Sequence, residues 1–344
     1  MTRSGAELSL GYYTDVVAPL LAARWPALPH AAARLGSGSD VLGLDDETSQ
    51  DHDWGLRLTL LVAGDAVETV DAYLAAELPQ EYRGQPIRFG TTWKPVASHQ
   101  VEVATAEGFA FSRLGVDASK PLEPDEWLSL TGQAILEVTA GPVFADTRGT
   151  LTGIRRRLDW YPDDLWRYVL AADWARIGQE IPFIGRAGSL GDDAGSRAIA
   201  ARIAVAAMRL GFLLERRWPP YSKWIGSVFA RLPSAGIAAP ALEAALSAGR
   251  WEDREAHLAE ALTVLNDLQR AIGLPTVDAV VAPFWDRPFL GLGGVPEVLL
   301  DSIADPVVRA LPPRVGSIEQ WVDNVDVLVS GPRRLAAARS LLTG

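Results

Sequence analysis

Residues 36–55 read GSGSDVLGLDDETSQDHDWG and lead into the apolar run LRLTLLV at 56–62. A short apolar run bounded by turn residues is typical of a buried strand, whereas the Gly, Ser and Asp residues before it are typical of turns. We therefore expect a short strand over 30–35, a Gly-Ser turn, a brief helical turn, and a second strand over 51–62.

Two aspartates stand at the predicted start of the second strand. Asp51 and Asp53 are two residues apart, so the alternation of side chains along a strand directs both carboxylates to one face. Such a pair suits a hard divalent cation such as Mg²⁺. Upstream, Gly36, Ser37 and Ser39 are the predicted phosphate contacts, because Gly allows close backbone approach and a Gly-Ser turn can present N–H and hydroxyl groups to an anion. The structural alternative is a solvated acidic loop before a buried strand.

These residues resemble a known family, the nucleotidyltransferases of the polymerase-beta type, which carry a Gly-Ser turn followed by Asp-x-Asp on the next strand. More narrowly, the chain is similar to a bacterial group described only as a domain of unknown function on that fold. The resemblance implies an α+β fold, with an N-terminal nucleotidyltransferase-like mixed β-sheet domain and a C-terminal helical bundle domain. Four stretches carry it: GSGSDVLGLDDETSQDHDW (36–54), YPDDLWRY (161–168), PYSKW (220–224) and GSIEQWVDN (316–324).

The resemblance also implies a third carboxylate. In this family an acid on a later strand beside the Asp pair binds metal or acts as a base, and Glu102 in the run VEVAT is the implied residue. Burial of an ionised carboxylate requires a partner or a metal, and the alternative is a sheet-edge glutamate that faces solvent. Asp146, which ends a predicted strand over 141–146, is the rival third carboxylate, although an aspartate there is also typical of a turn cap.

Two basic residues of the C-terminal half are further predicted nucleotide contacts. The resemblance implies that Lys223, at the start of a predicted helix in PYSKW, contacts the triphosphate, as a lysine near such a turn does in aminoglycoside-type nucleotidyltransferases. Arg202 shares a helix face with Arg209, seven residues later. Both guanidinium groups are expected either at a helix edge or in a polar cleft.

The chain is predicted to form a nucleotidyltransferase-like catalytic domain over 1–150 and a helical substrate- and nucleotide-binding domain over 151–344. Near residue 150 the sequence changes from short strands to long helical patterns. Because proline interrupts helices, we expect a break over 182–191. Predicted helices span 5–24, 67–78, 192–218, 239–247 and 253–272, and further predicted strands span 87–91 and 99–105.

Composition argues against several classes of function. The net charge of −11 argues against a long nucleic acid as partner, because such binding depends on Lys and Arg. There is no Cys, and the four His lack paired spacing, so a zinc site is not favoured. Acids at positions 7 and 15 interrupt the N-terminal apolar stretch, unlike a signal peptide, and no uncharged apolar run is long enough to span a membrane. We therefore expect a cytoplasmic protein with no membrane partner.

The preferred hypothesis is a Mg²⁺-dependent nucleotidyltransferase that moves a nucleoside monophosphate, AMP from ATP, to a hydroxyl of a small-molecule acceptor and releases pyrophosphate. A second hypothesis is an AMP-transferase of the antitoxin type that modifies a protein side chain, although those enzymes are usually short. A third is a catalytically silent nucleotide-binding regulator. The third is favoured by His52 between the two aspartates and by the extended spacing from Ser37 to Asp51.

Overall fold

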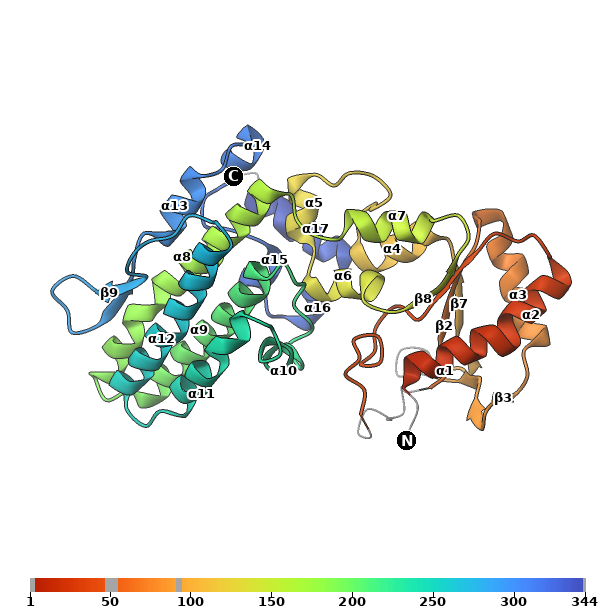
Figure 1. Cartoon of the computed structure of the whole chain (residues 1–344), viewed down its shortest axis with the longest axis horizontal. Helices are drawn as coiled ribbons and strands as arrows, with labels where there is room; N and C mark the ends of the chain where they lie inside the picture. Colours follow the sequence, from red (N-terminus) through yellow and green to blue (C-terminus); the bar gives the residue numbers. More distant parts are fainter. Residues whose placement is uncertain (1–3, 47–54, 91–94, 343–344) are drawn as a thin grey trace. The chain divides into compact units, whose positions relative to one another are not determined.

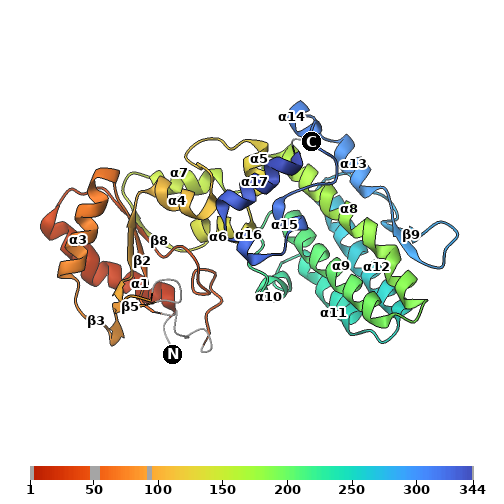
Figure 2. The same ribbon diagram turned by 180° about the vertical axis from the view of Figure 1, so that it is seen from behind.

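The computed structural model describes residues 4–46, 55–90 and 95–342. The contacts group the chain into two units, and Figures 1 and 2 draw it from opposite sides. The first unit comprises Met1–Leu122 and Ala134–Asp159, and the second comprises Glu123–Gln133 and Trp160–Gly344. The first contains a small mixed sheet with helices and the second is mainly helical, which confirms the predicted α+β class.

The first unit is built on a four-stranded sheet with the order β7-β2-β1-β8. β1 (Ala31–Ala33) is antiparallel to β2 (Leu58–Leu61) and to β8 (Val143–Asp146), whereas β2 is parallel to β7 (Val101–Ala104). β1 and β2 are buried along their whole length, which explains why their apolar runs do not alternate with polar residues. The second strand is therefore present, but it begins at Leu58 rather than at the predicted residue 51.

Helices cover one face of this sheet and form the main core of the unit (Figure 1). α1 (Gly5–Tyr12), a π-helical turn (Tyr13–Val17) and α2 (Ala18–Arg24) follow one another without a break, which confirms the helix predicted over 5–24. α3 (Val67–Glu77) confirms a second predicted helix. The core includes Tyr12, Val17, Leu21, Ala32, Leu58, Leu60, Val70, Leu74 and Val101.

The other face of the sheet is covered by α4 (Ala106–Leu114) and α7 (Thr150–Arg157), which pack on each other (Figures 1 and 2). Thr105 caps the start of α4, because its side chain accepts a hydrogen bond from the N–H of Gly108. α4 therefore begins directly after β7. Because the two elements are joined without a loop, the polar residues of α4 have a fixed position relative to β7.

The second unit is built on three long helices that pack on one another: α8 (Asp163–Gly188), α9 (Asp193–Leu214) and α12 (Trp251–Ala271). The predicted break over 182–191 is present but begins later than expected, because α8 continues through Pro182 to its end at Gly188 and α9 begins at Asp193. Ile181, Ile184 and Gly185 around this proline are buried, so tertiary packing outweighs the cost of about 3 kcal/mol that a proline imposes inside a helix.

Shorter elements complete both units. The first unit has the two-residue pairs β3 (Glu81–Tyr82) with β4 (Gln85–Pro86) and β5 (Arg88–Phe89) with β6 (Ser98–His99). α6 spans Gly132–Thr139.

None of the helices within the described ranges combines the length and the hydropathy needed to cross a membrane. The other elements are α5 (Pro124–Ser129), α10 (Ile225–Phe229), α11 (Ala239–Ser247), β9 (Val281–Pro283), β10 (Leu290–Leu292), α13 (Val295–Asp301), α14 (Pro306–Arg309), α15 (Ile318–Trp321), α16 (Val325–Leu328) and α17 (Gly331–Leu342).

Candidate functional site

The turn that follows β1 has a backbone conformation that favours glycine. Gly36 and Gly38 have φ angles of +87° and +144°, in the region that side-chain-bearing residues rarely adopt. The N–H of Gly36 donates a 2.8 Å hydrogen bond to the carbonyl oxygen of Glu137. Ser37 is exposed and Ser39 is half-buried. The structure therefore brings the three predicted phosphate contacts into one turn at the end of β1.

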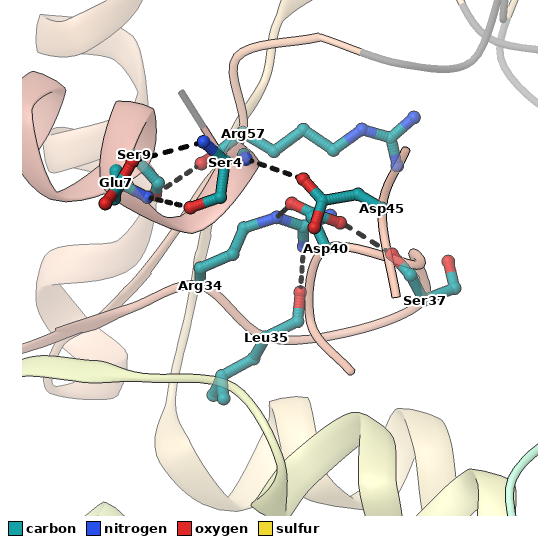
Figure 3. Close-up of polar contacts among 10 residues, drawn as sticks. Ser4, Glu7, Ser9, Arg34, Leu35, Ser37, Asp40, Asp45 and Arg57 are labelled. Carbon is teal, nitrogen blue, oxygen red and sulfur yellow. Dashed lines mark hydrogen bonds and ion pairs between the residues drawn. The ribbon is translucent and has the colours of Figure 1, made fainter. Parts of the chain in front are cut away.

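A buried ion pair closes this turn (Figure 3). Nε of Arg34 donates to Oδ2 of Asp40 at 2.7 Å and its Nη2 donates to Oδ1 at 2.9 Å, while the two side chains are only 5% and 9% exposed. The same guanidinium donates to the carbonyl oxygens of Leu35 and Ser37. A Cβ atom at Gly38 would lie 2.7 Å from Nη2 of Arg34, so a larger residue there would disturb the pair.

Both flanks of the segment 47–54 are anchored to the first turns of α1 (Figure 3). On one side, a carboxylate oxygen of Asp45 accepts a 3.0 Å hydrogen bond from the N–H of Gly5. On the other side, the hydroxyl of Ser9 donates to the carbonyl oxygen of Arg57 at 2.7 Å, directly before β2. Asp40 also abuts this helix end, because a Cβ atom at Gly5 would lie 2.6 Å from its Oδ2. One helix end therefore positions the Gly-Ser turn and both neighbours of the acidic segment.

Glu102 lies on β7, and its side chain faces solvent instead of being buried. In the sheet register Ala33 is paired with Thr59, and Thr59 is paired with Glu102, so all three lie at the end of β1 that leads into the turn. The side chain of Glu102 is 45% exposed, because β7 is an edge strand. Both carboxylate oxygens accept hydrogen bonds from Nη2 of Arg113, at 2.9 and 2.8 Å. Its role as third carboxylate stays a prediction.

Asp146 lies toward the opposite end of β1, where it pairs with Ala31. Its Oδ2 accepts hydrogen bonds from the backbone N–H and the hydroxyl of Thr152, at 2.8 and 2.7 Å, so it caps the first turn of α7. Asp146 also lines a pocket of about 130 Å³ together with His30 and Arg148. Of the two candidate third carboxylates, Glu102 is the one at the turn-bearing end of β1.

The predicted metal ligands Asp51 and Asp53 lie outside the described residues. Within 4–46, 55–90 and 95–342, no group of three or more His, Asp or Glu residues could hold a metal ion. The remaining predicted ligand, Glu102, has both oxygens bonded to Arg113. The described residues alone do not form a metal site, so they support no catalytic step that involves a metal ion. The Mg²⁺ hypothesis rests on Asp51 and Asp53.

Lys223 and Arg202 both belong to the second unit. Lys223 is exposed and precedes α10, whose N-cap is Trp224; its predicted place in a first helical turn is therefore wrong. The segment forms a turn instead, closed by a 2.8 Å hydrogen bond from the N–H of Trp224 to the carbonyl oxygen of Tyr221. Arg202 lies at a helix edge, where it is 62% exposed and its Nη2 is 2.6 Å from Oε1 of Glu180. Their contacts with a nucleotide stay predictions.

The helical unit contains a buried charged cluster that the sequence interpretation missed. Asp173 on α8 is fully buried, and neither carboxylate oxygen has a hydrogen-bond partner of acceptable geometry among the described residues. Burial raises the pKa of Asp173 to about 7, against the opposing effects of Arg209, the nearby Gln320 amide and Arg176. Arg176 and Arg209 donate to the carbonyl oxygens of Gln320 and Glu319, respectively. Burial also raises the pKa of Glu319.

Two of the sequence stretches behind the family resemblance meet in the core of this unit. Tyr168 in YPDDLWRY accepts a 3.1 Å hydrogen bond from the N–H of Gly316 in GSIEQWVDN and donates a 2.8 Å bond to the carbonyl oxygen of Pro312. The side chain of Gln320 donates to the carbonyl oxygen of Val169 at 2.9 Å. These contacts give the two stretches a role in packing.

Sequence reasoning also missed the residues that organise the turn. Arg34 and Asp40 flank the Gly-Ser turn, and opposite charges six residues apart around two glycines are a local signal that could have indicated the pair. Arg113 and Glu137 have no such signal, because they come from helices that are distant in sequence from the turn. Only the three-dimensional fold brings those two residues to Gly36.

Comparison with known proteins gives a family match and a structural match. A family model described as "Domain of unknown function (DUF4037)" matches residues 127–225, a segment that contains YPDDLWRY and PYSKW. Among solved structures, a nucleotidyltransferase-like protein from Exiguobacterium sibiricum 255-15 is similar over 76% of this chain and 74% of that chain, with 14% identity and a TM-score of 0.34. No curated protein matches. The family match names no activity, and a TM-score this low carries no argument about the site.

Proposed function

We propose that the chain is a Mg²⁺-dependent nucleotidyltransferase that acts on ATP or another nucleoside triphosphate. An acceptor hydroxyl of a small molecule would attack the α-phosphorus, the bond between the α-phosphorus and the bridging oxygen would break, and pyrophosphate would leave. The hydroxyl proton would pass to a carboxylate of the site. This reaction class is supported by the resemblance carried by GSGSDVLGLDDETSQDHDW together with the placement of its described part, residues 36–46, at the end of β1.

One observation supports the proposal most directly. The first turns of α1 hold Asp45 and Arg57, which lie two and three residues outside the segment 47–54, and also abut Asp40 of the Gly-Ser turn. A phosphate-binding turn and a pair of metal-binding acids must be adjacent for metal-assisted transfer of a nucleotide. Anchoring of the turn and of both flanks of the acid pair to one helix end supports that adjacency.

The proposed roles follow from the chemistry of each residue. Ser37 and Ser39 would hold the terminal phosphates through hydroxyls and backbone N–H groups, and Gly36, whose own N–H donates to Glu137, would allow the phosphates to approach the backbone closely. Asp51 and Asp53 would hold Mg²⁺, which when bound neutralises charge on the leaving phosphates. Glu102 would take the acceptor's proton or add a metal ligand, and that role requires Glu102 to leave Arg113. Lys223 and Arg202 stay proposed contacts of the triphosphate.

A second candidate function is a nucleotide-binding regulator without turnover. The ion pair of Glu102 with Arg113 favours it, because both oxygens of the carboxylate are occupied by the guanidinium and neither is free to accept a hydrogen bond from the acceptor hydroxyl. The two candidates make opposite predictions for pyrophosphate release, while both predict binding of a triphosphate.

The test measures pyrophosphate release with Mg²⁺ and each nucleoside triphosphate across a panel of hydroxyl-bearing small molecules. We expect release by the wild type and none by the double variant Asp51→Asn with Asp53→Asn, whose far-UV spectrum should be unchanged. Asp286→Asn is the matched control, because that carboxylate is 92% exposed and lies in the second unit. Unchanged activity in the double variant would refute the metal role, and triphosphate binding without pyrophosphate release would favour the regulator.

A further inference from the structure

Arg113 joins three elements next to the Gly-Ser turn. It lies near the end of α4, its guanidinium carbon is 4.7 Å from the ring centroid of Phe109, and its Nη2 binds both oxygens of Glu102 on β7. Its Nε is 3.5 Å from Oε2 of Glu137 on α6. The side chain is 25% exposed, so solvent reaches a group that two carboxylates hold.

The guanidinium also lies against the turn itself. A Cβ atom built on Gly36 would lie 3.6 Å from Nη2 and 3.9 Å from Nε of Arg113, with no closer atom from the described residues other than Gly36 itself and its two chain neighbours. Gly36 is tied to the same group of residues, because its N–H donates to the carbonyl oxygen of Glu137. A phosphate held by this turn would therefore meet a guanidinium within contact distance.

The charges around Arg113 explain how it could exchange partners. The local group of Arg113, Glu102 and Glu137 carries a net charge of −1, and the Glu102 side chain is 45% exposed. An ion pair with this exposure is weakly held, because solvent screens it. A guanidinium binds phosphate oxygens with a geometry that matches two parallel hydrogen bonds, and a triphosphate carries several negative charges on adjacent groups.

We propose that Arg113 binds the terminal phosphates of the triphosphate at the Gly36 turn and that Glu102 holds its guanidinium in place until the phosphates replace that carboxylate. The inference rests on the proposed function and deepens it, because the exchange releases Glu102 for its role in transfer. Arg113 is thus a substrate-binding residue, and its ion pair couples arrival of the triphosphate to the readiness of Glu102.

The test is calorimetric titration of the full chain with inorganic tripolyphosphate in EDTA at low salt. Arg113→Gln should weaken binding tenfold or more, because a charge-assisted contact is lost, and Arg113→Lys should recover part of the loss. Glu102→Gln should strengthen binding several-fold, because it removes the competitor of the phosphate. The opposite signs of these two effects separate ligand binding from damage to the fold.

Two matched controls accompany these variants. Glu107→Gln removes one exposed negative charge from the same helix as Arg113, and Arg148→Gln removes an exposed positive charge from the other end of the sheet. Both should bind tripolyphosphate as the wild type does. The inference is overturned if Arg113→Gln binds within twofold of the wild type, if Glu102→Gln binds no more tightly than Glu107→Gln, or if the wild type does not bind tripolyphosphate.

The proposed function has a separate criterion. It fails when the wild type neither binds a Mg²⁺-triphosphate nor releases pyrophosphate, whatever the variants of Arg113 do. If the wild type does both and Arg113→Gln is unaffected in tripolyphosphate binding, the inference alone is wrong and another group holds the phosphates.

Discussion

Asp40→Asn should destabilise the first unit by leaving a buried guanidinium without its counter-charge. The substitution keeps the shape of the side chain and removes the negative charge that faces Arg34, whose side chain is 5% exposed. The carboxylate accepts two hydrogen bonds, at 2.7 and 2.9 Å, and the Asn side chain retains one acceptor oxygen. The variant should therefore lose one charge-assisted hydrogen bond and the ion-pair attraction.

The expected loss in the free energy of unfolding is about 3 kcal/mol, at the lower end of the range for removing one partner of a buried pair. Asp15→Asn is the matched control in the same unit, because Asp15 and Arg83 form a pair that is 47% and 42% exposed. A pair with that exposure contributes under about 1 kcal/mol. The two variants remove the same charge from the same unit. Asp15→Asn leaves a half-exposed guanidinium and keeps an acceptor oxygen for the hydroxyl of Tyr82, which bonds to Asp15 at 2.6 Å, whereas Asp40→Asn leaves a buried guanidinium.

The assay is hydrogen exchange measured by mass spectrometry on peptides from β1 and β2, at a series of urea concentrations. Since the chain forms two units, a global spectroscopic signal would mix two transitions, whereas these peptides report on the first unit alone. Equal stability of Asp40→Asn and Asp15→Asn, or a loss below about 1 kcal/mol in Asp40→Asn, would refute the argument that the buried pair holds the turn.

Two further predictions concern the helical unit and the base of the turn. Burial raises the pKa of Asp173 from 3.8 to about 7 in the folded state, so the folded state binds the proton more tightly. The contribution of Asp173 to stability is therefore complete below pH 4 and is lost, by roughly 4 kcal/mol, as the pH rises to about 7. Hydrogen exchange of peptides from α8, measured over a series of urea concentrations at pH 5 and at pH 8, should therefore show a smaller loss of stability with rising pH in Asp173→Asn than in the wild type, and equal losses would contradict the prediction. Gly141→Ala would place a Cβ atom 1.7 Å from the carbonyl oxygen of Arg34, so the backbone must shift, and hydrogen exchange of peptides from β1 and β2 should show a loss of stability of about 2 kcal/mol or more. Gly43→Ala, with φ of +65° and no atom within 4 Å, should lose only about 1 kcal/mol from backbone strain.

Local sequence patterns predicted the positions of several helices well. They predicted less well where β2 begins and whether Pro182 interrupts a helix. The helix over 239–247 was predicted to the residue, and those over 5–24 and 67–78 to within one, because apolar spacing and flanking prolines are local signals. The start of β2 was misplaced because residues 55–57 lie before its pairing with β1 and β7. Pro182 was misinterpreted because packing of α8 overrides its helix-breaking tendency.

The candidate site was only partly predictable for a related reason. The turn that contains Gly36, Ser37 and Ser39 was predicted because glycine at such positions reflects the local backbone, whereas the contact of these residues with phosphate stays a prediction. The exposure of Glu102 depends on β7 being an edge strand, and the place of Arg113 depends on how α4 packs against the sheet, so both are consequences of contacts between segments distant in sequence. A single sequence contains no local pattern for such contacts.

The central claim is that Asp51 and Asp53 hold a Mg²⁺ ion that carries a nucleotide beside the Gly36 turn. Its most direct test is calorimetric titration of the wild type and of the Asp51→Asn, Asp53→Asn double variant with a non-hydrolysable ATP analogue, in Mg²⁺ and in EDTA. We predict that the wild type binds at least tenfold more tightly in Mg²⁺ than in EDTA, and that the double variant binds equally in both. A wild type whose affinity does not depend on Mg²⁺, or a double variant that keeps the full dependence, would contradict the claim.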